Sequence, residues 1–240
     1  MCNTQGDTPI RLKRRPIAQS IENLDQLMNL EKGRMSRDLF WDRDIYEQEL
    51  ERIFARCWLF VGHESQIPKA GDYVSTYLGE DNVLIVRQKD GSVKGFLNTC
   101  PHRGNKVCFA DLGNARQFVC NYHGWAFGID GALKGMHASE TYEAAGMDKS
   151  EHGLHPVAHV DSYRGLIFAT LDPEAPSLAE YLGDMRYYLD AIFDMDEGGT
   201  EFIGGCVKSV IQCNWKYASE NFVGDILHAG WTHDSGAKAM

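Results

Sequence analysis

The sequence predicts an α+β protein, in which a compact antiparallel β unit over about residues 57–171 is flanked by helical segments. Three observations lead to this prediction. Short segments rich in β-branched and aromatic residues follow one another through the β unit, and Gly or Asp bounds them. Apolar residues recur at helical spacing before and after it. Two Asp-Gly pairs, at 90–91 and 130–131, are typical of tight hairpin turns because glycine tolerates positive φ.

The segment before residue 57 is expected to contain a polar arm and two helices. Residues 1–19 carry the basic cluster Arg11–Pro16, which a solvated tail explains better than a patch for an anionic partner. Apolar spacing then predicts helices over 20–30 and 44–58. The chain is thus expected to enter the β unit from a helix.

Five segments are expected to be strands of the β unit, namely 72–78, 82–88, 92–98, 116–120 and 165–171. Beyond the unit, Ser177 and Glu180 are spaced as a capping box at the start of a helix over 178–193. A strand over 206–215 is then expected to lead into a helix over 218–231.

Composition and charge exclude several classes of protein. The formal net charge of −10 argues against nucleic-acid binding, which needs a basic surface. We expect no membrane span and a cytoplasmic location, because no apolar run approaches about 20 residues and no signal-peptide stretch is present. The number of cysteines, seven, is odd, and clustered Cys and His in a reducing compartment suggest a metal rather than disulfides.

Two Cys–His pairs inside the β unit form the first candidate site. "CPHRG" contains Cys100 and His102, and "CNYHGW" contains Cys120 and His123, so the pattern is C-x-H, seventeen residues, then C-x2-H. Two such pairs on neighbouring loops can hold a [2Fe–2S] cluster, with both thiolates on one iron and both imidazoles on the other, which is the Rieske arrangement. A glycine after each pair, at 104 and 124, is expected to let the loops approach the cluster closely.

A structural zinc site is the main alternative for these four residues. Such sites usually begin with two ligands separated by two to four residues, whereas Cys100 and His102 have one residue between them. Core Cys and His with this double spacing by coincidence are less plausible still. Cys108 lies between the pairs, fits neither and is expected to serve packing.

The second candidate site lies near the last residues, where Asp225, His228 and His233 follow the pattern D-x2-H-x4-H. His233 would lie about 140° around a regular helix from His228. For both to reach one metal, the helix is expected to loosen or end at Ala229-Gly230. Taken alone, the segment is better explained by two unrelated histidines. Beside the first site it suggests the two-His-one-carboxylate Fe(II) site of mononuclear oxygenases.

Together the motifs resemble the large (α) subunit of Rieske-type aromatic-ring-hydroxylating dioxygenases, in particular the naphthalene and biphenyl dioxygenase group. The resemblance rests on "CPHRG…CNYHGW" and "NWKYASENFVGDILHAGWTH" and extends from about residue 40, through "GHESQIPKAGDYV", "VRQKDGS" and "SYRGLIFA". It implies a Rieske domain at 57–171, inserted in or followed by an α/β catalytic domain of the helix-grip type. That domain would begin at 172–240, with the arm and helices of 1–56 packed on it, and would continue beyond these 240 residues.

The resemblance also implies the roles of individual residues. One [2Fe–2S] cluster would be bound by the two Cys–His pairs, and one mononuclear Fe(II) by His228 and His233. Its third ligand would be an aspartate downstream of this sequence, because Asp234 and Glu220 do not match the ligand position. Asp225 would link the iron to a cluster histidine, His123, of a neighbouring subunit in an α trimer. Three residues would lie near the iron or line the pocket, Asn221, Phe222 and Ala229, although helix packing explains the last two equally well.

The implied reaction is dihydroxylation of an aromatic hydrocarbon to a cis-dihydrodiol with O₂. Electrons from NADH would arrive through a reductase and a ferredoxin, and a small β subunit can accompany the α trimer. A Rieske mono-oxygenase or demethylase is the nearest alternative, and an electron carrier and a zinc-stabilised interaction module are the others. The sequence does not identify the substrate, because the residues that select it lie mostly downstream in the family.

Overall fold

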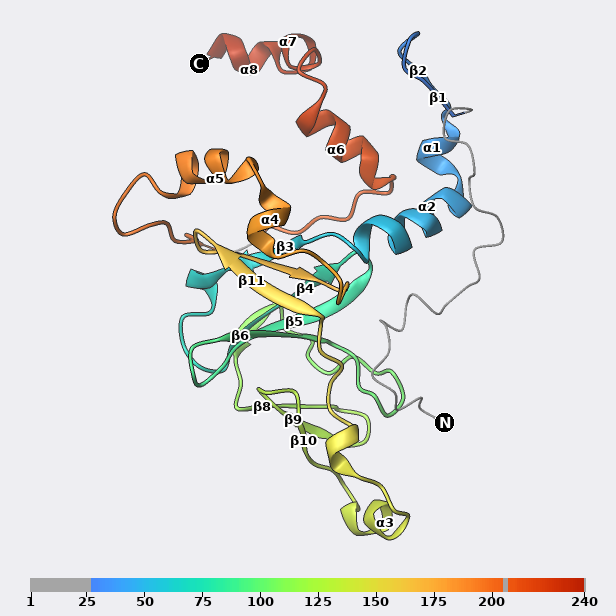
Figure 1. Cartoon of the computed structure of the whole chain (residues 1–240), viewed down its shortest axis with the longest axis vertical. Coiled ribbons are helices and arrows are strands. Elements are labelled where there is room, and N and C mark those ends of the chain that lie inside the picture. Colours follow the sequence, from blue (N-terminus) through green and yellow to red (C-terminus); the bar gives the residue numbers. More distant parts are fainter. Residues whose placement is uncertain (1–26, 205–206, 240) are drawn as a thin grey trace. The chain divides into compact units, whose positions relative to one another are not determined.

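The computed structural model describes residues 27–204 and 207–239. The described chain divides into two compact units (Figure 1). Of the described residues, 49–203 belong to the first unit, and 27–48, 204 and 207–239 belong to the second. In the described residues, no helix is long and apolar enough to cross a membrane.

Three antiparallel sheets make up most of the first unit, and their strand orders are β11-β12-β3, β6-β5-β4-β7 and β10-β9-β8. The strands are β3 (Leu59–His63), β4 (Asp72–Leu78), β5 (Asp81–Arg87), β6 (Val93–Leu97), β7 (Leu112–Asn114), β8 (Gln117–Val119), β9 (Ala126–Gly128), β10 (Leu133–Gly135), β11 (His159–Tyr163) and β12 (Leu166–Thr170). The helical elements are the π-helix η3 (Leu50–Phe54), the 3₁₀ turns η4 (Glu64–Gln66) and η5 (Lys149–Glu151), and the α-helices α3 (Ser139–Ala144), α4 (Leu178–Leu182) and α5 (Met185–Phe193).

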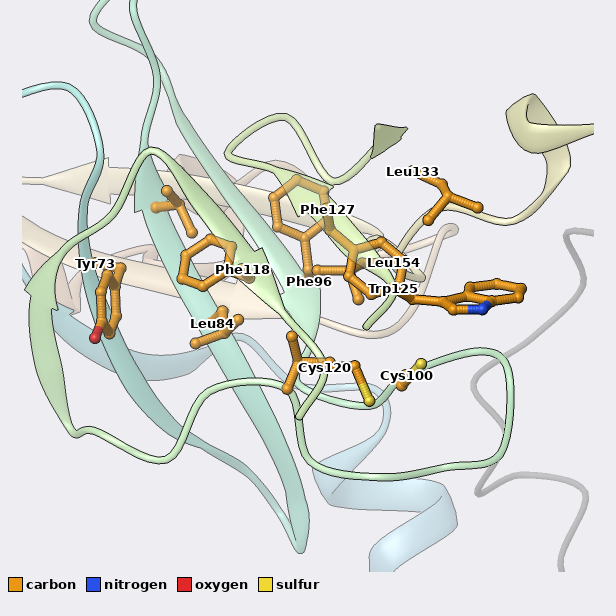
Figure 2. Packing of buried hydrophobic residues seen from close by; sticks show 12 residues of the cluster. Tyr73, Leu84, Phe96, Cys100, Phe118, Cys120, Trp125, Phe127, Leu133 and Leu154 are labelled. Carbon is orange, nitrogen blue, oxygen red and sulfur yellow. The ribbon is translucent and has the colours of Figure 1, made fainter. Parts of the chain in front are cut away.

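The four-stranded sheet is covered on both faces, and β5 explains how. Side chains of successive strand residues point to opposite faces, so Val83 and Ile85 join one buried cluster while Leu84 and Val86 join another. All four are at most 1% exposed. The first cluster includes β12 and the second includes β8, β9 and β10 together with Cys100 and Cys120 (Figure 2). Because both faces of β5 are buried, its apolar residues form an uninterrupted run over 83–86, instead of alternating with polar residues.

The predicted strands are confirmed, and the segment 72–78 has the bounds of β4. The segments 82–88, 92–98, 116–120 and 165–171 correspond to β5, β6, β8 and β12. Both Asp-Gly pairs lie in hairpin turns, between β5 and β6 and between β9 and β10, and Gly91 and Gly131 have φ of 85° and 81°. The prediction missed the strands β3, β7, β9, β10 and β11. Three of these five have only three residues, which is too short for a periodic signal.

The two turn glycines allow a matched test of packing. A Cβ at Gly131 would overlap the buried Phe96 ring, whereas a Cβ at Gly91 would meet nothing within 4 Å. We expect Gly131→Ala to lower the free energy of unfolding by about 2–4 kcal/mol, because it adds overpacking to backbone strain. Gly91→Ala, with strain alone, should cost about 1 kcal/mol. Chemical denaturation measures both, and equal losses would contradict the role assigned to the Phe96 contact.

The predicted capping box is confirmed, but the helix that it starts is shorter than expected. Ser177 Oγ accepts a hydrogen bond from the Glu180 backbone N–H at 3.3 Å, and Glu180 Oε2 accepts one from the Ser177 N–H at 3.1 Å. The expected helix over 178–193 is two helices, α4 and α5, because Gly183 takes a φ of 48° between them.

The second unit is mainly helical. It contains the short paired strands β1 (Met28–Asn29) and β2 (Arg34–Met35), and the helices α1 (Asp38–Trp41), α2 (Arg43–Glu49), α6 (Trp215–Val223), α7 (Ala229–Thr232) and α8 (Asp234–Ala239). Helix α2 runs on into η3, so the expected helix over 44–58 is confirmed for most of its length. Most of the expected helix over 20–30 lies outside the described residues, and its last part is wrong because residues 28–29 are in β1.

The expected strand over 206–215 is also wrong. Residues 207–214 are irregular, and no strand of the described chain pairs with them. Val207 and Val210 are 99% and 87% exposed. Their β-branched side chains favour a strand only where a neighbour covers them. The helix expected over 218–231 is interrupted, since α6 ends at Val223 and α7 begins at Ala229.

Candidate metal centres

The first Cys–His pair lies in a tight loop after β6. Cys100 donates its backbone N–H to Asn105 O at 2.8 Å, and its own carbonyl accepts the Gly104 N–H at 2.8 Å. Gly104 has a φ of 79°, a conformation that favours glycine. These bonds turn the chain back on itself within five residues and hold the cysteine and histidine on the same loop.

The second pair lies in an equivalent loop between β8 and β9. The backbone N–H of Cys120 donates to Trp125 O at 2.8 Å, and the Cys120 carbonyl accepts the Gly124 N–H at 2.9 Å. Gly124 has a φ of 70°. The loops thus repeat one backbone design, and the need for positive φ is a reason for the two glycines that the sequence analysis did not give.

The two loops bring the two cysteines together and the two histidines together. Cys100 and Cys120 are each 2% exposed, and their sulfur atoms lie close to each other on neighbouring loops (Figure 2). The rings of His102 and His123 lie 4.6 Å apart, centroid to centroid. The site therefore contains one pair of thiols and one pair of imidazoles, and each loop supplies one member of each pair.

The protonation of these groups follows from burial and from their neighbours. Burial, with a smaller contribution from nearby Cys120, raises the pKa of Cys100 to about 11, although hydrogen bonds from the His102 and Arg103 backbone act in the opposite direction. Burial also opposes ionisation of Cys120, but hydrogen bonds from the Tyr122 backbone and the Asn105 amide outweigh it and lower the pKa of Cys120. Burial and the adjacent His123 lower the pKa of His102, which favours the neutral imidazole that a metal needs.

Aromatic rings enclose the imidazoles. Trp125, 2% exposed, stacks on His102 with ring centroids 4.8 Å apart and planes 4° apart. Tyr122 lies against His123 at 4.0 Å and is 63% exposed. His102 therefore has a buried ring against it, whereas the ring against His123 is exposed.

The donor set fits a two-iron cluster better than a single ion. Within residues 27–204 and 207–239, no three His, Cys, Asp or Glu side chains are grouped so that they could hold one metal ion. A mononuclear zinc site needs such a group. A Rieske cluster takes two ligands on each of two irons, so its thiol pair and imidazole pair lie apart.

The second candidate site lies in the other unit and is formed by α7 and its ends. His228 precedes α7 and His233 follows it, and their rings lie 5.2 Å apart. The helix was expected to loosen at Ala229-Gly230, and this is wrong, because both residues are helical. Instead the helix is a single turn with a histidine at each end: His228 keeps right-handed helical angles, and the backbone leaves helical geometry only at His233, with a φ of −106° and a ψ of 14°.

Asp225 holds His228 from the preceding turn. Its Oδ1 accepts the His228 backbone N–H at 3.1 Å, and its Oδ2 lies 3.6 Å from His228 Nδ1. The same Nδ1 is hydrogen-bonded to the backbone carbonyl of Asp225. A carbonyl only accepts, so Nδ1 carries the proton and the lone pair of Nε2 is available to a metal.

The other predicted residues lie nearby in sequence. Asn221 and Phe222 are near the end of α6, where Phe222 is 87% exposed, and half-buried Ala229 begins α7. Asp234 begins α8, and its Oδ2 forms an ion pair with Lys238 Nζ at 2.6 Å. Contacts of Asn221, Phe222 and Ala229 with iron or substrate stay predictions.

A family comparison identifies the segment that contains the first site. Residues 57–161 match the family model described as Rieske [2Fe-2S] domain. This segment is a Rieske domain. It contains both loops and all four expected cluster ligands.

Known relatives extend the similarity beyond the Rieske domain. The biphenyl 2,3-dioxygenase subunit alpha of Rhodococcus jostii (strain RHA1) is 48% identical over 219 residues, covering 90% of this chain and 47% of that protein. The benzene 1,2-dioxygenase subunit alpha of Pseudomonas putida is 47% identical over 242 residues, covering 99% and 52%. The chain therefore spans about half the length of the curated relatives it matches, and the expected kinship with dioxygenase alpha subunits is confirmed.

Solved structures agree with this relationship. Naphthalene 1,2-dioxygenase from Rhodococcus sp. bound to indole has a TM-score of 0.79 and 41% identity, covering 85% of this chain and 46% of that one. A quaternary ammonium Rieske monooxygenase in complex with L-carnitine has a TM-score of 0.74 and 26% identity, covering 85% and 56%. The predicted α+β class with an antiparallel Rieske domain is confirmed.

Two residues at the Rieske site were missed by the sequence analysis. Asn105 reaches Cys120 from the other loop, and Tyr122 lies against His123. Tyr122 stands inside the quoted motif "CNYHGW" and could have been considered, because it adjoins a ligand. Asn105 carried no such signal, since its contact crosses between loops.

Proposed function

We propose that the chain is the Rieske-bearing part of an aromatic-ring-hydroxylating dioxygenase alpha subunit. The observation that carries the proposal is the presence of two metal motifs in one chain, the paired loops of the Rieske domain and the histidines on either side of α7. In this proposal, 57–171 forms the cluster domain. Residues 172–240 would begin a catalytic domain of the helix-grip type.

The residues of the chain have distinct tasks in the proposed reaction. Cys100, Cys120, His102 and His123 would hold the [2Fe–2S] cluster, which supplies electrons one at a time. Two histidines, His228 and His233, would hold Fe(II), where O₂ reacts with the ring to give a cis-dihydrodiol. Asp225 keeps the proton of His228 on Nδ1, away from the nitrogen that binds the metal. The third iron ligand of the proposal is an aspartate outside these 240 residues.

The proposed partners follow from the same relationship. Electrons would come from NADH through a reductase and a ferredoxin in the cytoplasm. The subunits would form an α trimer, in which Asp225 meets His123 of a neighbouring copy, with or without a small β subunit. Asn221, Phe222 and Ala229 would lie near the iron and the substrate. An apolar aromatic hydrocarbon is the proposed substrate, in line with the biphenyl, benzene and naphthalene named for the relatives.

A mono-oxygenase of the Rieske class is the second candidate. It is favoured only by the similarity to the quaternary ammonium monooxygenase, whose 26% identity is well below the 41–48% of the dioxygenases. An electron carrier would not need His228 and His233. A zinc-stabilised module would not place two thiols and two imidazoles as separate pairs.

Two measurements test the proposal. The purified protein should contain acid-labile sulfide and iron and, once reduced, give the electron paramagnetic resonance signal of a Rieske cluster. With ferredoxin, reductase, NADH and O₂, the complete oxygenase should convert naphthalene, biphenyl or benzene to a cis-dihydrodiol. Zinc without sulfide would overturn the cluster assignment, and a monohydroxylated or demethylated product would favour the mono-oxygenase.

A further inference from the structure

The amide of Asn105 connects the two loops of the Rieske site. Its Nδ2 lies 3.6 Å from Cys120 Sγ, which is within hydrogen-bond range for sulfur. The same nitrogen lies 2.9 Å from Asn121 Oδ1 and 3.1 Å from Lys106 O. Asn105 belongs to the loop of Cys100, so this contact reaches a ligand of the opposite loop.

The neighbours of the amide fix its orientation. Lys106 O is a backbone carbonyl and can only accept a hydrogen bond. A flipped amide would place the Asn105 oxygen against that carbonyl and against the sulfur, which is unfavourable at both contacts. The nitrogen therefore faces Cys120, and its N–H groups point toward acceptors only.

The equivalent position of the second loop supplies no such donor. Asn105 accepts the N–H of Cys100 in one loop, and Trp125 accepts the N–H of Cys120 in the other. The indole Nε1 of Trp125 is buried and has no hydrogen-bond partner in the parts of the chain that the structure describes. The two loops share a backbone design, but only Asn105 directs a side-chain donor at a cluster sulfur.

We propose that Asn105 is a positioning residue that raises the reduction potential of the cluster through its N–H contact with Cys120 Sγ. The inference rests on the proposed function only in requiring that the four ligands hold a [2Fe–2S] cluster. One-electron reduction, by the ferredoxin of the proposal, makes the cluster more negative. A hydrogen-bond donor at a ligand sulfur stabilises the more negative state, so it favours reduction.

A structural role for Asn105 would be to join the loops through Asn121 alone. The variants Asn105→Leu and Asn121→Leu separate the two roles. The first removes the donor at the sulfur and keeps nearly the same side-chain volume. The second removes the acceptor on the neighbouring loop and leaves the donor in place. Asn105→Asp, which has the same shape as asparagine but an oxygen at the donor position, serves as a second probe.

The test is a redox titration of the cluster-loaded protein, followed by electron paramagnetic resonance of the reduced cluster. At the midpoint potential of the unaltered protein, we expect Asn105→Leu to lower the ratio of reduced to oxidised cluster by about three- to tenfold, where tenfold corresponds to 59 mV. Asn105→Asp should lower it at least as much. Asn121→Leu should change it by less than about twofold, because its hydrogen bond does not involve the sulfur.

Equal potentials for Asn105→Leu and the unaltered protein would overturn the inference. So would an equal shift in Asn121→Leu, or loss of the cluster in all three variants, since either would assign Asn105 to loop structure. Absence of acid-labile sulfide from the unaltered protein is a different result. It would refute the proposed function itself.

Discussion

Replacing Cys120 with alanine is expected to reduce the acid-labile sulfide of the purified protein to about a tenth or less of its original content. The sulfur of Cys120 is one of two that face each other between the loops, and each Rieske cluster needs both. Loss of one thiolate leaves an iron with an open position and no replacement sulfur within its own loop. Sulfide and iron analysis, with the visible spectrum of the oxidised cluster, measures the outcome.

Cys108→Ala is the matched control. Cys108 lies between the two loops in sequence and is half-buried, but its Sγ lies 3.7 Å from Ala110 O, and its backbone N–H donates to Asn98. The backbone bond survives the substitution, so full sulfide content is expected. Retention of the cluster in Cys120→Ala, or equal loss in both variants, would contradict the assignment of ligands.

The second large effect is expected for Asp225→Asn. In the complete oxygenase, product formation should fall by about 100-fold or more, while both metals stay bound. The carboxylate accepts the His228 N–H and lies beside its Nδ1, and in the proposed trimer it also meets a cluster histidine of the neighbouring copy. An amide keeps the shape but removes the charge that stabilises these contacts. Iron and sulfide content, together with dihydrodiol yield, separate electron transfer from metal loss.

Asp234→Asn provides the control for this substitution. Asp234 lies nine residues after Asp225 and allows the same aspartate-to-asparagine substitution. Its ion-pair partner is the exposed Lys238. Exposed ion pairs contribute little, so unchanged turnover is expected. Normal turnover in Asp225→Asn with both centres loaded would contradict the bridging role, and loss of iron would assign the residue to metal binding instead.

The sequence predicted those parts that depend on local spacing. Cys100 and His102 lie within three residues of chain, and Cys120 and His123 within four. In each case a backbone hydrogen bond from a glycine, Gly104 or Gly124, to the cysteine carbonyl closes a five-residue loop. The turn glycines and the capping box at Ser177 are likewise local. These features could be read before any fold was known, since their geometry needs only neighbours in the chain.

The features that escaped prediction depend on distant neighbours or on covering surfaces. Asn105 has a role only because the second loop brings Cys120 within 3.6 Å. Residues 207–214 carry β-branched side chains, yet without a pairing partner in the described chain they form no strand. The spacing of His228 and His233 suggested a loosened helix, but a one-turn helix with both residues at its ends satisfies the same spacing.

The burial of β5 on both faces has a consequence for how this protein can evolve. Val83 and Ile85 face the layer that contains β12, and Leu84 and Val86 face the layer that contains the cysteines. A change of volume on either side is transmitted through one shared strand, because packed interiors leave little free space. Substitutions in the β12 layer, which holds none of the four expected cluster ligands, are therefore constrained by the packing around those cysteines.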